Sequence, residues 1–506
     1  MKESIITTKA QRHRGFLMAF PGSAISLLSL CLWVFVVQTF SQETIPAPGA
    51  PRSAAIPAVK EIKLKNGLTV AVAEKHNVPL VTVQLLVRNG AGAENNKLPG
   101  LANLTASLLT KGTKTRSATQ IAEEIEFLGG SIFSFAGWQN SSVGMSITSD
   151  KFDRAMEIMA DVTLNPSFTE DELKLARSQT LDEMTYSLTQ PSFLASYVAS
   201  RYSFGEHPAG GTPASIAAIS RADIASFYSD NYRPAESVLI FVGDITPEKA
   251  AAAAEKYFGA WKKEGRGYGS GSAGVVGATD PKPVVRRMLI VDLPNAGQAA
   301  VNFVKPIRGV GRRSKQYYAA SVLNSLLGGG YSSRLNLEIR IKRGLSYGAG
   351  SNFGWRDGAA NFSARTQTKN ESAAQVAELI IAEIKRLAET SASEAELSPR
   401  KSVLTGGFGR NLETTQGLAG AIADLYTFRI PTSELNAYMS NVNSVQSVDL
   451  KEFASMSLFQ GDIIIVGDYS VFKDDLAKRF PGQQIAVIKA SELDIDSETL
   501  RKGDVR

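Results

Sequence analysis

A short apolar stretch near the start of the chain places polar residues at the spacing of a two-histidine metal site. Residues 100–113 have the sequence G-L-A-N-L-T-A-S-L-L-T-K-G-T, in which Asn103 and Ser107 are four positions apart and Ala106 lies between them. On a helix, positions 103 and 107 point the same way. Histidines there, with a glutamate at 106, would bind zinc and supply a general base. An amide, a methyl group and a hydroxyl do not provide that chemistry.

The other side chains that could bind a metal do not replace this site. The chain has three histidines, His13, His76 and His207, and one cysteine, Cys31. We expect His76 in a surface turn between strands, and His207 in a loop where it stabilises a helix or a turn. With one cysteine the chain forms no internal disulfide, so its stability must come from its core.

At 506 residues the chain is too long for one ordinary hydrophobic core, and its two halves follow the same plan. Each half has a charged amphipathic segment that ends at glycine before an alternating run, and an apolar run that ends in Gly-Asp. Three pairs of segments match in the same order: 100–109 with 318–327, 121–137 with 337–350, and 238–244 with 463–468. The chain therefore carries a weak internal repeat.

Within each half the predicted order is strands, helix, strands, helices and a closing strand. We expect a strand at 78–87 and helices at 151–161 and 170–188, with Asp150 and Thr169 as N-caps. This order predicts an α+β fold of two homologous domains, each an antiparallel-rich sheet with helices on one face. Two such domains joined by a glycine-rich linker can face each other as a clamshell.

The N-terminal segment and two linkers set the predicted domain boundaries. A basic stretch, an apolar run over 24–37 and small residues at 39 and 41 form a secretory signal, so we expect a periplasmic or secreted protein. A retained inner-membrane anchor is the alternative. The formal net charge of +6 is too small and dispersed to predict nucleic-acid binding. The predicted parts are a signal peptide (1–41), a Pro/Ala-rich linker (42–58), a first domain (59–264), a Gly/Ser-rich linker (265–283), a second domain (284–490) and a charged tail (491–506).

Four segments in order resemble the pitrilysin-like (inverzincin, M16) zinc metallopeptidases, especially the short bacterial and mitochondrial-processing-peptidase type. The resemblance covers essentially the whole chain after the signal, and four ordered matches are far more specific than any single motif. The segments are NGLTVAVAEKHNVPLVTVQLLVRNGAGAE, GLANLTASLLTKGT, FGEHPAGGTPASIAAISRADIASFYSDNYRP and LLGGGYSSRLNLEIRIKRGLSYGAGS.

This resemblance implies that the zinc site is degenerate. In active members the first helix carries H-x-x-E-H, whose histidines bind zinc and whose glutamate takes a proton from the metal-bound water. A glutamate on a later helix is the third ligand, and Glu183 in L-D-E-M matches it. Because the other three positions hold Asn103, Ala106 and Ser107, we expect this chain to bind no zinc. Glu183 is then expected to be a solvated or capping carboxylate.

The second half keeps a different pair. Arg340 and Tyr347, seven positions apart in E-I-R-I-K-R-G-L-S-Y, match an Arg/Tyr pair that contacts the substrate backbone and the oxyanion in the family. We expect Arg340 in the last turn of a helix and Tyr347 at the start of the next strand. The resemblance also places Gly328, Gly329 and Gly330 beside a peptide cleft. Each of these residues has an alternative, purely structural role. Arg340 could belong to an ordinary amphipathic helix face, Tyr347 could be one more strand aromatic, and the glycines could simply end a helix.

Together these residues imply one subunit of a two-subunit enzyme. The chain resembles the zinc-free subunit of a heterodimeric peptidase, whose homologous partner carries H-x-x-E-H and the zinc. Its expected substrates are extended peptides or unfolded segments, held as an added strand on a sheet edge. The alternative is a peptide-binding or structural scaffold of the M16 fold with no proteolytic role. The residues at 103, 106 and 107 exclude an independent zinc peptidase.

Overall fold

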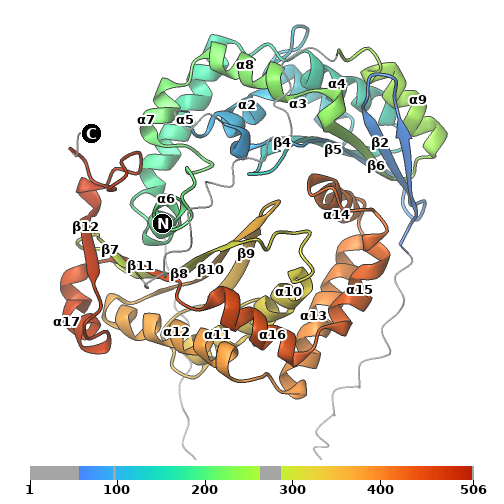
Figure 1. Cartoon of the computed structure of the whole chain (residues 1–506). Coiled ribbons are helices and arrows are strands. Elements are labelled where there is room, and N and C mark those ends of the chain that lie inside the picture. Colours follow the sequence, from blue (N-terminus) through green and yellow to red (C-terminus); the bar gives the residue numbers. More distant parts are fainter. Residues whose placement is uncertain (1–55, 95–97, 263–286, 504–506) are drawn as a thin grey trace, which may run out of the picture. The chain divides into compact units, whose positions relative to one another are not determined.

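Two six-stranded sheets form the framework of the protein (Figure 1). The computed structural model describes residues 56–94, 98–262 and 287–503, and both sheets belong to one compact unit, Ala54–Arg506. In spatial order the first sheet holds β1 (Val59–Lys63), β2 (Thr69–Glu74), β6 (Ser237–Gly243), β3 (Leu80–Val87), β5 (Ser141–Thr148) and β4 (Ser131–Ala136). In the same order the second sheet holds β12 (Ile485–Lys489), β7 (Met288–Asp292), β11 (Asp462–Gly467), β8 (Ala299–Arg308), β10 (Ala359–Thr368) and β9 (Ala349–Trp355).

The two sheets repeat one topology. The central strand β6 is parallel to β2 and antiparallel to β3, and β11 has the same relation to β7 and β8. The outermost strands differ, because β1 is antiparallel to β2 whereas β12 is parallel to β7. The predicted match between residues 238–244 and 463–468 is therefore a match between β6 and β11.

Each half of the chain also supplies a set of helices. Those of the first half are α2 (Leu101–Leu109), α3 (Ala118–Phe127), α4 (Phe152–Leu164), α5 (Glu170–Ser187), α6 (Pro191–Tyr202), α7 (Pro213–Ala218), α8 (Arg221–Asn231) and α9 (Pro247–Phe258). Those of the second half are α10 (Tyr317–Leu327), α11 (Arg334–Asn336), α12 (Ala373–Glu389), α13 (Glu394–Leu412), α14 (Thr415–Thr427), α15 (Glu434–Ser444), α16 (Ser447–Phe453) and α17 (Tyr469–Arg479).

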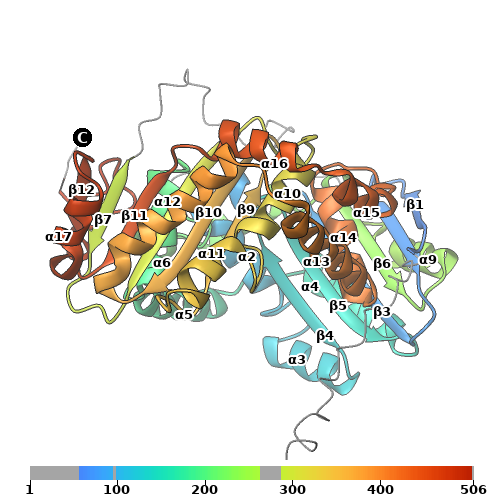
Figure 2. The ribbon, with the colours of Figure 1, turned by 90° about the horizontal axis from the view of Figure 1, so that it is seen from below.

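One face of each sheet is covered by helices of its own half. In the first half, apolar residues of α2, α4, α8 and α9 pack on alternate residues of the strands, such as Val83 and Phe241. In the second half, α10, α12 and α16 cover the corresponding face, where Phe303 and Phe362 are fully buried (Figure 2). Together with the two sheets, these helices confirm the predicted α+β fold of two similar domains.

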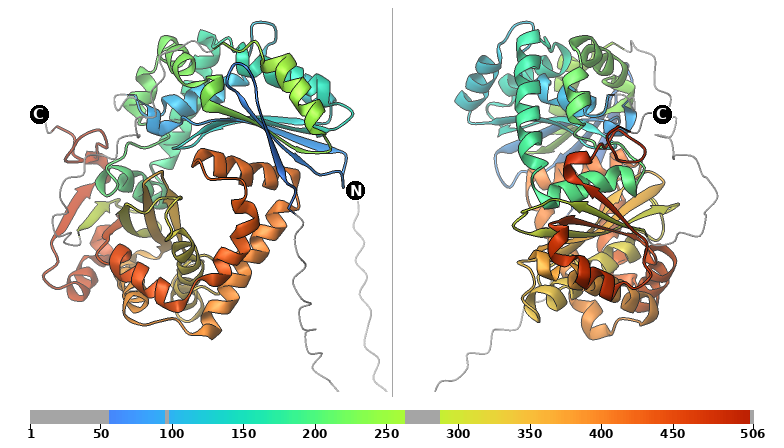
Figure 3. Two further views of the ribbon diagram at one scale, coloured as in Figure 1. Left: turned by 45° about the vertical axis from the view of Figure 1, so that its right-hand side comes forward. Right: turned by 90° about the vertical axis from the view of Figure 1, so that its left-hand side faces the viewer.

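The other face of each sheet is covered by one helix from the opposite half. Leu418 and Ile422 of α14 pack on the first sheet, against Ile240 among others. Leu194 and Val198 of α6 pack in the same way on β8 and β11 of the second sheet. Figure 3 shows α14, in orange, against the blue and green strands. The expectation of helices on one face only is therefore incomplete, because each half contributes a helix to its counterpart.

Local boundaries agree with the predicted elements to within three residues, and two expected details differ. Thr169 caps α5 as predicted, since its side chain accepts from the backbone N–H of Glu172. Asp150 is not the cap of α4, because that helix begins one residue later and Lys151 occupies the N-cap without a side-chain bond. Tyr347 precedes β9 by two residues and does not open it. In the part of the chain that the structure describes, no helix is long and apolar enough to cross a membrane.

Candidate functional site

The three positions that match the zinc motif lie on α2, and each is engaged within the chain. Asn103 Nδ2 donates to the carbonyl oxygen of Ala209 at 2.7 Å. Ser107 Oγ donates at 2.9 Å to the carbonyl oxygen three residues earlier on its own helix. Ala106 is fully buried, and its carbonyl oxygen accepts from Ser134 Oγ of β4 at 2.7 Å. These contacts make α2 a structural helix that supports the edge strand of the first sheet.

Glu94 closes the N-terminus of α2. Its side chain is fully shielded from solvent, and its two oxygens accept from the backbone N–H groups of Gly100 at 3.0 Å and Ala102 at 2.6 Å. Burial raises the pKa of Glu94 to about 8, although the two backbone hydrogen bonds oppose this shift. His207 lies 3.6 Å from Glu94 and packs at a tilt against Trp138, with ring centroids 4.9 Å apart. His207 thus packs at a helix end, as expected, and its burial lowers its pKa.

The fourth position of the motif, Glu183, is exposed on α5, a helix that packs against α2. It makes no hydrogen bond or ion pair with the described residues. His76 is half exposed in a turn after β2, where its Nδ1 lies 2.8 Å from Asp244 Oδ1, as expected for a surface residue. Neither side chain approaches α2 through a hydrogen bond or ion pair of the described residues.

The donor set around α2 does not fit zinc. It offers an amide that already donates, a methyl group, a hydroxyl that bonds its own helix and one carboxylate, whereas zinc takes histidine, cysteine and carboxylate ligands. Within residues 56–94, 98–262 and 287–503, no three or more His, Cys, Asp and Glu side chains are grouped to hold a metal ion. The metal chemistry of an H-x-x-E-H helix therefore has no donor set here.

Arg340 lies on a single π-helical turn, Leu337–Ile341, that follows α11. The turn ends before Gly344, which has a positive φ of 65° and so occupies the left-handed region that terminates helices. The guanidinium of Arg340 stacks on the ring of Tyr331, 5.0 Å from its centroid. Single π-helical turns occur often at functional sites, because they widen the helix and redirect side chains.

The charged side chains next to Arg340 pair with one another. Glu338 is 2.5 Å from Lys342 Nζ and 2.6 Å from a guanidinium nitrogen of Arg343. Arg340 itself has no carboxylate partner among the described residues. It therefore carries a positive charge that is held by an aromatic ring and remains available to another molecule.

Several apolar and aromatic side chains in the segment that carries Arg340 are exposed. Tyr347 is 90% exposed and Tyr331 is 67% exposed, and both belong to the segment that carries Arg340. Leu337 and Ile341, on the same π-helical turn, are also exposed. Exposed apolar residues that gather around a charged group are typical of an interaction site.

The three consecutive glycines after α10 differ in what requires them. Gly328 is the C-cap of α10, and a Cβ there would lie 2.2 Å from the backbone nitrogen of Ser351. A Cβ on Gly329 would lie 2.8 Å from Cα of Ser325. Gly330 faces open space, with no atom within 4 Å of such a Cβ. The first two glycines are thus needed for packing within the chain, and Gly330 alone lacks such a reason.

A cluster that no local sequence pattern signals joins the two halves of the chain. Arg356, after β9, donates to both carboxylate oxygens of Glu206 at 3.1 and 2.8 Å, and its guanidinium lies 4.8 Å from the Trp138 ring. Asn361 adds a hydrogen bond to Glu206 at 2.9 Å. Arg356 and Glu206 are 150 positions apart, so only the tertiary structure reveals the contact.

Two similar sheet-and-helix domains, the first with its motif helix α2, define a metallopeptidase-like fold. Two family models agree with this class: "Insulinase (Peptidase family M16)" matches residues 69–201, and "Peptidase M16 inactive domain" matches residues 218–404. Together they span more than half of the sequence. The chain belongs to peptidase family M16.

Relatives with curated names agree with this assignment. A protein of Mycobacterium tuberculosis named "Uncharacterized zinc protease" is 28% identical over 394 residues, which cover 77% of this chain and 86% of that protein. A Bacillus subtilis protein named "Uncharacterized zinc protease YmxG" is 23% identical over 361 residues, which cover 71% of this chain and 85% of that protein.

Solved structures show the same fold. An M16 inactive domain from Pseudomonas fluorescens has a TM-score of 0.73 at 23% identity and covers 81% of this chain and 98% of its own. A protease from Helicobacter pylori has a TM-score of 0.74 at 22% identity and covers 81% of this chain and all of its own.

Proposed function

We propose that this chain is the zinc-free subunit of a heterodimeric M16 zinc endopeptidase. Its first domain acts as a scaffold, and its second domain supplies Arg340 and Tyr347 to the active site of a homologous partner that carries H-x-x-E-H. The observation that supports this proposal is a contrast between two sites. Asn103 and Ser107 are hydrogen-bonded within the chain, whereas Tyr347 is exposed and Arg340 lacks a carboxylate partner in the described residues.

A guanidinium and a phenol suit this task because they are hydrogen-bond donors of fixed direction. Attack on a peptide carbonyl places negative charge on its oxygen, and each donor aimed at that oxygen contributes about 3 kcal/mol once water is excluded. Stacking on Tyr331 restricts the guanidinium of Arg340 before the substrate arrives. The zinc of the partner would supply the activated water for the same carbonyl.

Extended peptides or unfolded segments are the proposed substrates. Within the described sheet β4 pairs only with β5, so its outer backbone edge can take an added strand. Phe133 and Phe135 of β4 line a pocket of about 590 Å³ on one face of the sheet, which Gln84 and Ser142 also line. Backbone hydrogen bonds of this kind hold many sequences, and specificity then depends on pockets for side chains. We place this activity in the periplasm or outside the cell, on the basis of the N-terminal signal pattern, which lies outside the described residues.

Co-purification from the native cells tests the proposal. The tagged chain should bring down a stoichiometric M16 protein with H-x-x-E-H, and the pair should contain one zinc. In the reconstituted pair, Arg340→Ala should lower kcat/KM about 100-fold while assembly and zinc content stay unchanged. Lys342→Ala is the matched control, since Lys342 belongs to the same segment but pairs with Glu338.

Two results would contradict the proposal. If the chain assembles only with itself or with proteins outside the family, the alternative of a peptide-binding or structural scaffold holds. If Arg340→Ala and Lys342→Ala both leave turnover unchanged, Arg340 has no role in catalysis.

A further inference from the structure

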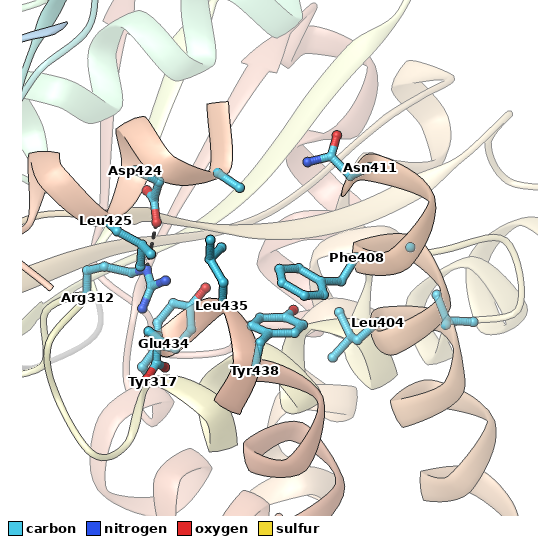
Figure 4. Close-up of a pocket in the computed structure, with 13 residues that line it drawn as sticks. Arg312, Tyr317, Leu404, Phe408, Asn411, Asp424, Leu425, Glu434, Leu435 and Tyr438 are labelled. Atoms are coloured by element: carbon cyan, nitrogen blue, oxygen red, sulfur yellow. Dashed lines mark hydrogen bonds and ion pairs between the residues drawn. The ribbon is translucent and has the colours of Figure 1, made fainter. Parts of the chain in front are cut away.

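A pocket of about 390 Å³ lies in the second half between α10, α13, α14 and α15 (Figure 4). Its walls are largely apolar and include Leu404, Leu425 and Leu435. The rings of Phe408 and Tyr438 stack at one side, with centroids 4.1 Å apart and an interplanar angle of 21°. This volume is within the range of about 300–1,000 Å³ that is usual for sites of small ligands. We call it the α13 pocket.

The polar groups of the α13 pocket leave one negative charge without a basic partner. Arg312 is buried, stacks 3.8 Å from the Tyr317 ring centroid and donates through Nε to Asp424 at 3.0 Å, so these two charges balance. Glu434 accepts a hydrogen bond from the Tyr318 hydroxyl and has no basic partner among the described residues. A largely apolar pocket with one unbalanced carboxylate favours a long side chain with a cationic tip.

The helix that forms one wall carries glycines that its own packing does not require. Gly406, Gly407 and Gly409 lie inside α13, where each costs about 1 kcal/mol relative to alanine. A Cβ at any of the three would meet no atom closer than 3.4 Å. None of the three has a positive φ. Gly407 lines the pocket, and a missing Cβ there leaves backbone open to close approach by a ligand.

The α13 pocket continues into the pocket beside β4. Asn411 and Asp424 line both, and the second pocket is bounded on its far side by Phe133, Phe135 and Ser142. A peptide strand beside β4 that enters the second pocket would therefore border the α13 pocket. This continuity argues for a side chain of a peptide rather than a free small molecule.

We propose that the α13 pocket binds a lysine or arginine side chain of an extended peptide whose backbone lies beside β4. The cationic tip pairs with Glu434, and its aliphatic stem packs on the Phe408 and Tyr438 rings. The proposal rests on the proposed function only in taking a peptide as the ligand. It needs neither zinc nor a partner subunit, so it is tested on this chain alone.

The test is fluorescence anisotropy of a labelled ten-residue peptide with one central arginine, titrated with the purified chain. A peptide with citrulline in place of arginine keeps the shape and removes the charge. We expect the arginine peptide to bind about tenfold more tightly, since a charge-assisted hydrogen bond of ordinary strength corresponds to at least that factor in Kd. Glu434→Gln should abolish this preference, and the glutamine carbonyl oxygen can still accept the hydrogen bond that the Tyr318 hydroxyl donates.

Two glycine variants separate binding from stability. Gly407→Ala and Gly409→Ala should both raise Tm by a few degrees, because each removes a helical glycine. Only Gly407→Ala should weaken binding of the arginine peptide, by severalfold, because Gly409 does not line the pocket and its Cβ would point toward Met439.

Three results would overturn the proposal. Equal Kd values for the arginine and citrulline peptides would remove the role of charge. Equal effects of the two glycine variants on binding would show that the pocket is not the site. Binding of N-acetylarginine amide as tight as that of the peptide would make it a site for small cations. If co-purification finds no partner with H-x-x-E-H but the chain still prefers the arginine peptide, the proposed function is contradicted and this inference stands.

Discussion

Glu94 links burial at the degenerate helix to a measurable pH dependence of stability. The carboxylate sits under the N-terminus of α2 with no exposed surface, and it accepts two backbone hydrogen bonds. Its pKa is raised from the ordinary 4.5 to about 8 because burial disfavours the charged form. We predict the effect of Glu94→Gln, which removes the titrating group and keeps its size.

The sign follows from the raised pKa. Between pH 4.5 and about pH 8 the folded state holds a proton that the unfolded state has released. The stability that this proton provides is fully present below pH 4.5 and is lost as the pH rises through 8. At about 1.4 kcal/mol per pKa unit the full shift corresponds to about 5 kcal/mol, and with solvent relaxation we expect a loss of about 2–4 kcal/mol.

The variant should therefore follow a different curve from that of the natural protein. Because glutamine can accept through only one of its two terminal atoms, Glu94→Gln should lose about 1 kcal/mol at pH 5. Its free energy of unfolding should lack the decline between pH 5 and 8, so that the gap closes or reverses by pH 9. Groups that do not contact Glu94 titrate in both proteins and cancel in the difference, whereas His207, 3.6 Å from Glu94, contributes to it together with Glu94.

Urea unfolding followed by tryptophan fluorescence from pH 5 to 9 measures both curves. Glu123→Gln, an exposed position on α3, is the control and should follow the natural protein at every pH. Parallel curves for the natural protein and Glu94→Gln would refute the reasoning. They would mean that the backbone hydrogen bonds outweigh burial and keep Glu94 charged throughout.

Two further predictions concern the packing of α2 and the contact between the halves. Ala106→Glu, at a fully buried position, should lower the free energy of unfolding by about 2–4 kcal/mol, whereas exposed Ser107→Glu should change it by less than about 0.5 kcal/mol. Equal urea midpoints for these two variants would mean that α2 is not held as described. Glu206→Gln and Arg356→Met, made singly and together, should give a coupling energy of about 1–2 kcal/mol, because both side chains are about four-fifths buried. A coupling energy near zero in this double-mutant cycle would mean that α6 and α14, each packed on the sheet of the opposite half, are the main connection between the halves.

The repeat and the fold could be predicted because their signals are local. Residues 238–244 form a nearly continuous apolar run, which is typical of a strand buried on both faces, and β6 is such a strand. What covers its second face could not be predicted. The covering helix, α14, comes from the other half, and helical periodicity says which face of a helix is apolar but not which sheet that face meets.

The candidate site also has some features that local sequence patterns predict and others that depend on the tertiary structure. Positions 103, 106 and 107 could be assigned to one helix from spacing and family pattern. Asp150 does not cap α4, because that helix begins at Phe152 and Lys151 occupies its N-cap. The Glu94 cap and the stacking of Arg340 on a tyrosine depend on contacts between separate segments. Residue types alone carry no information about such contacts.

The packing of α2, and of the helix that each half contributes to the other, explains how an M16 chain without H-x-x-E-H keeps its structure. α2 still covers the first sheet, and hydrogen bonds from Asn103 and Ser107 satisfy the positions where ligands would stand. The first half also supplies α6, without which the apolar face around Val304 and Ile464 of the second sheet would be open to water. The second half, which carries Arg340, therefore needs the first half for its own stability.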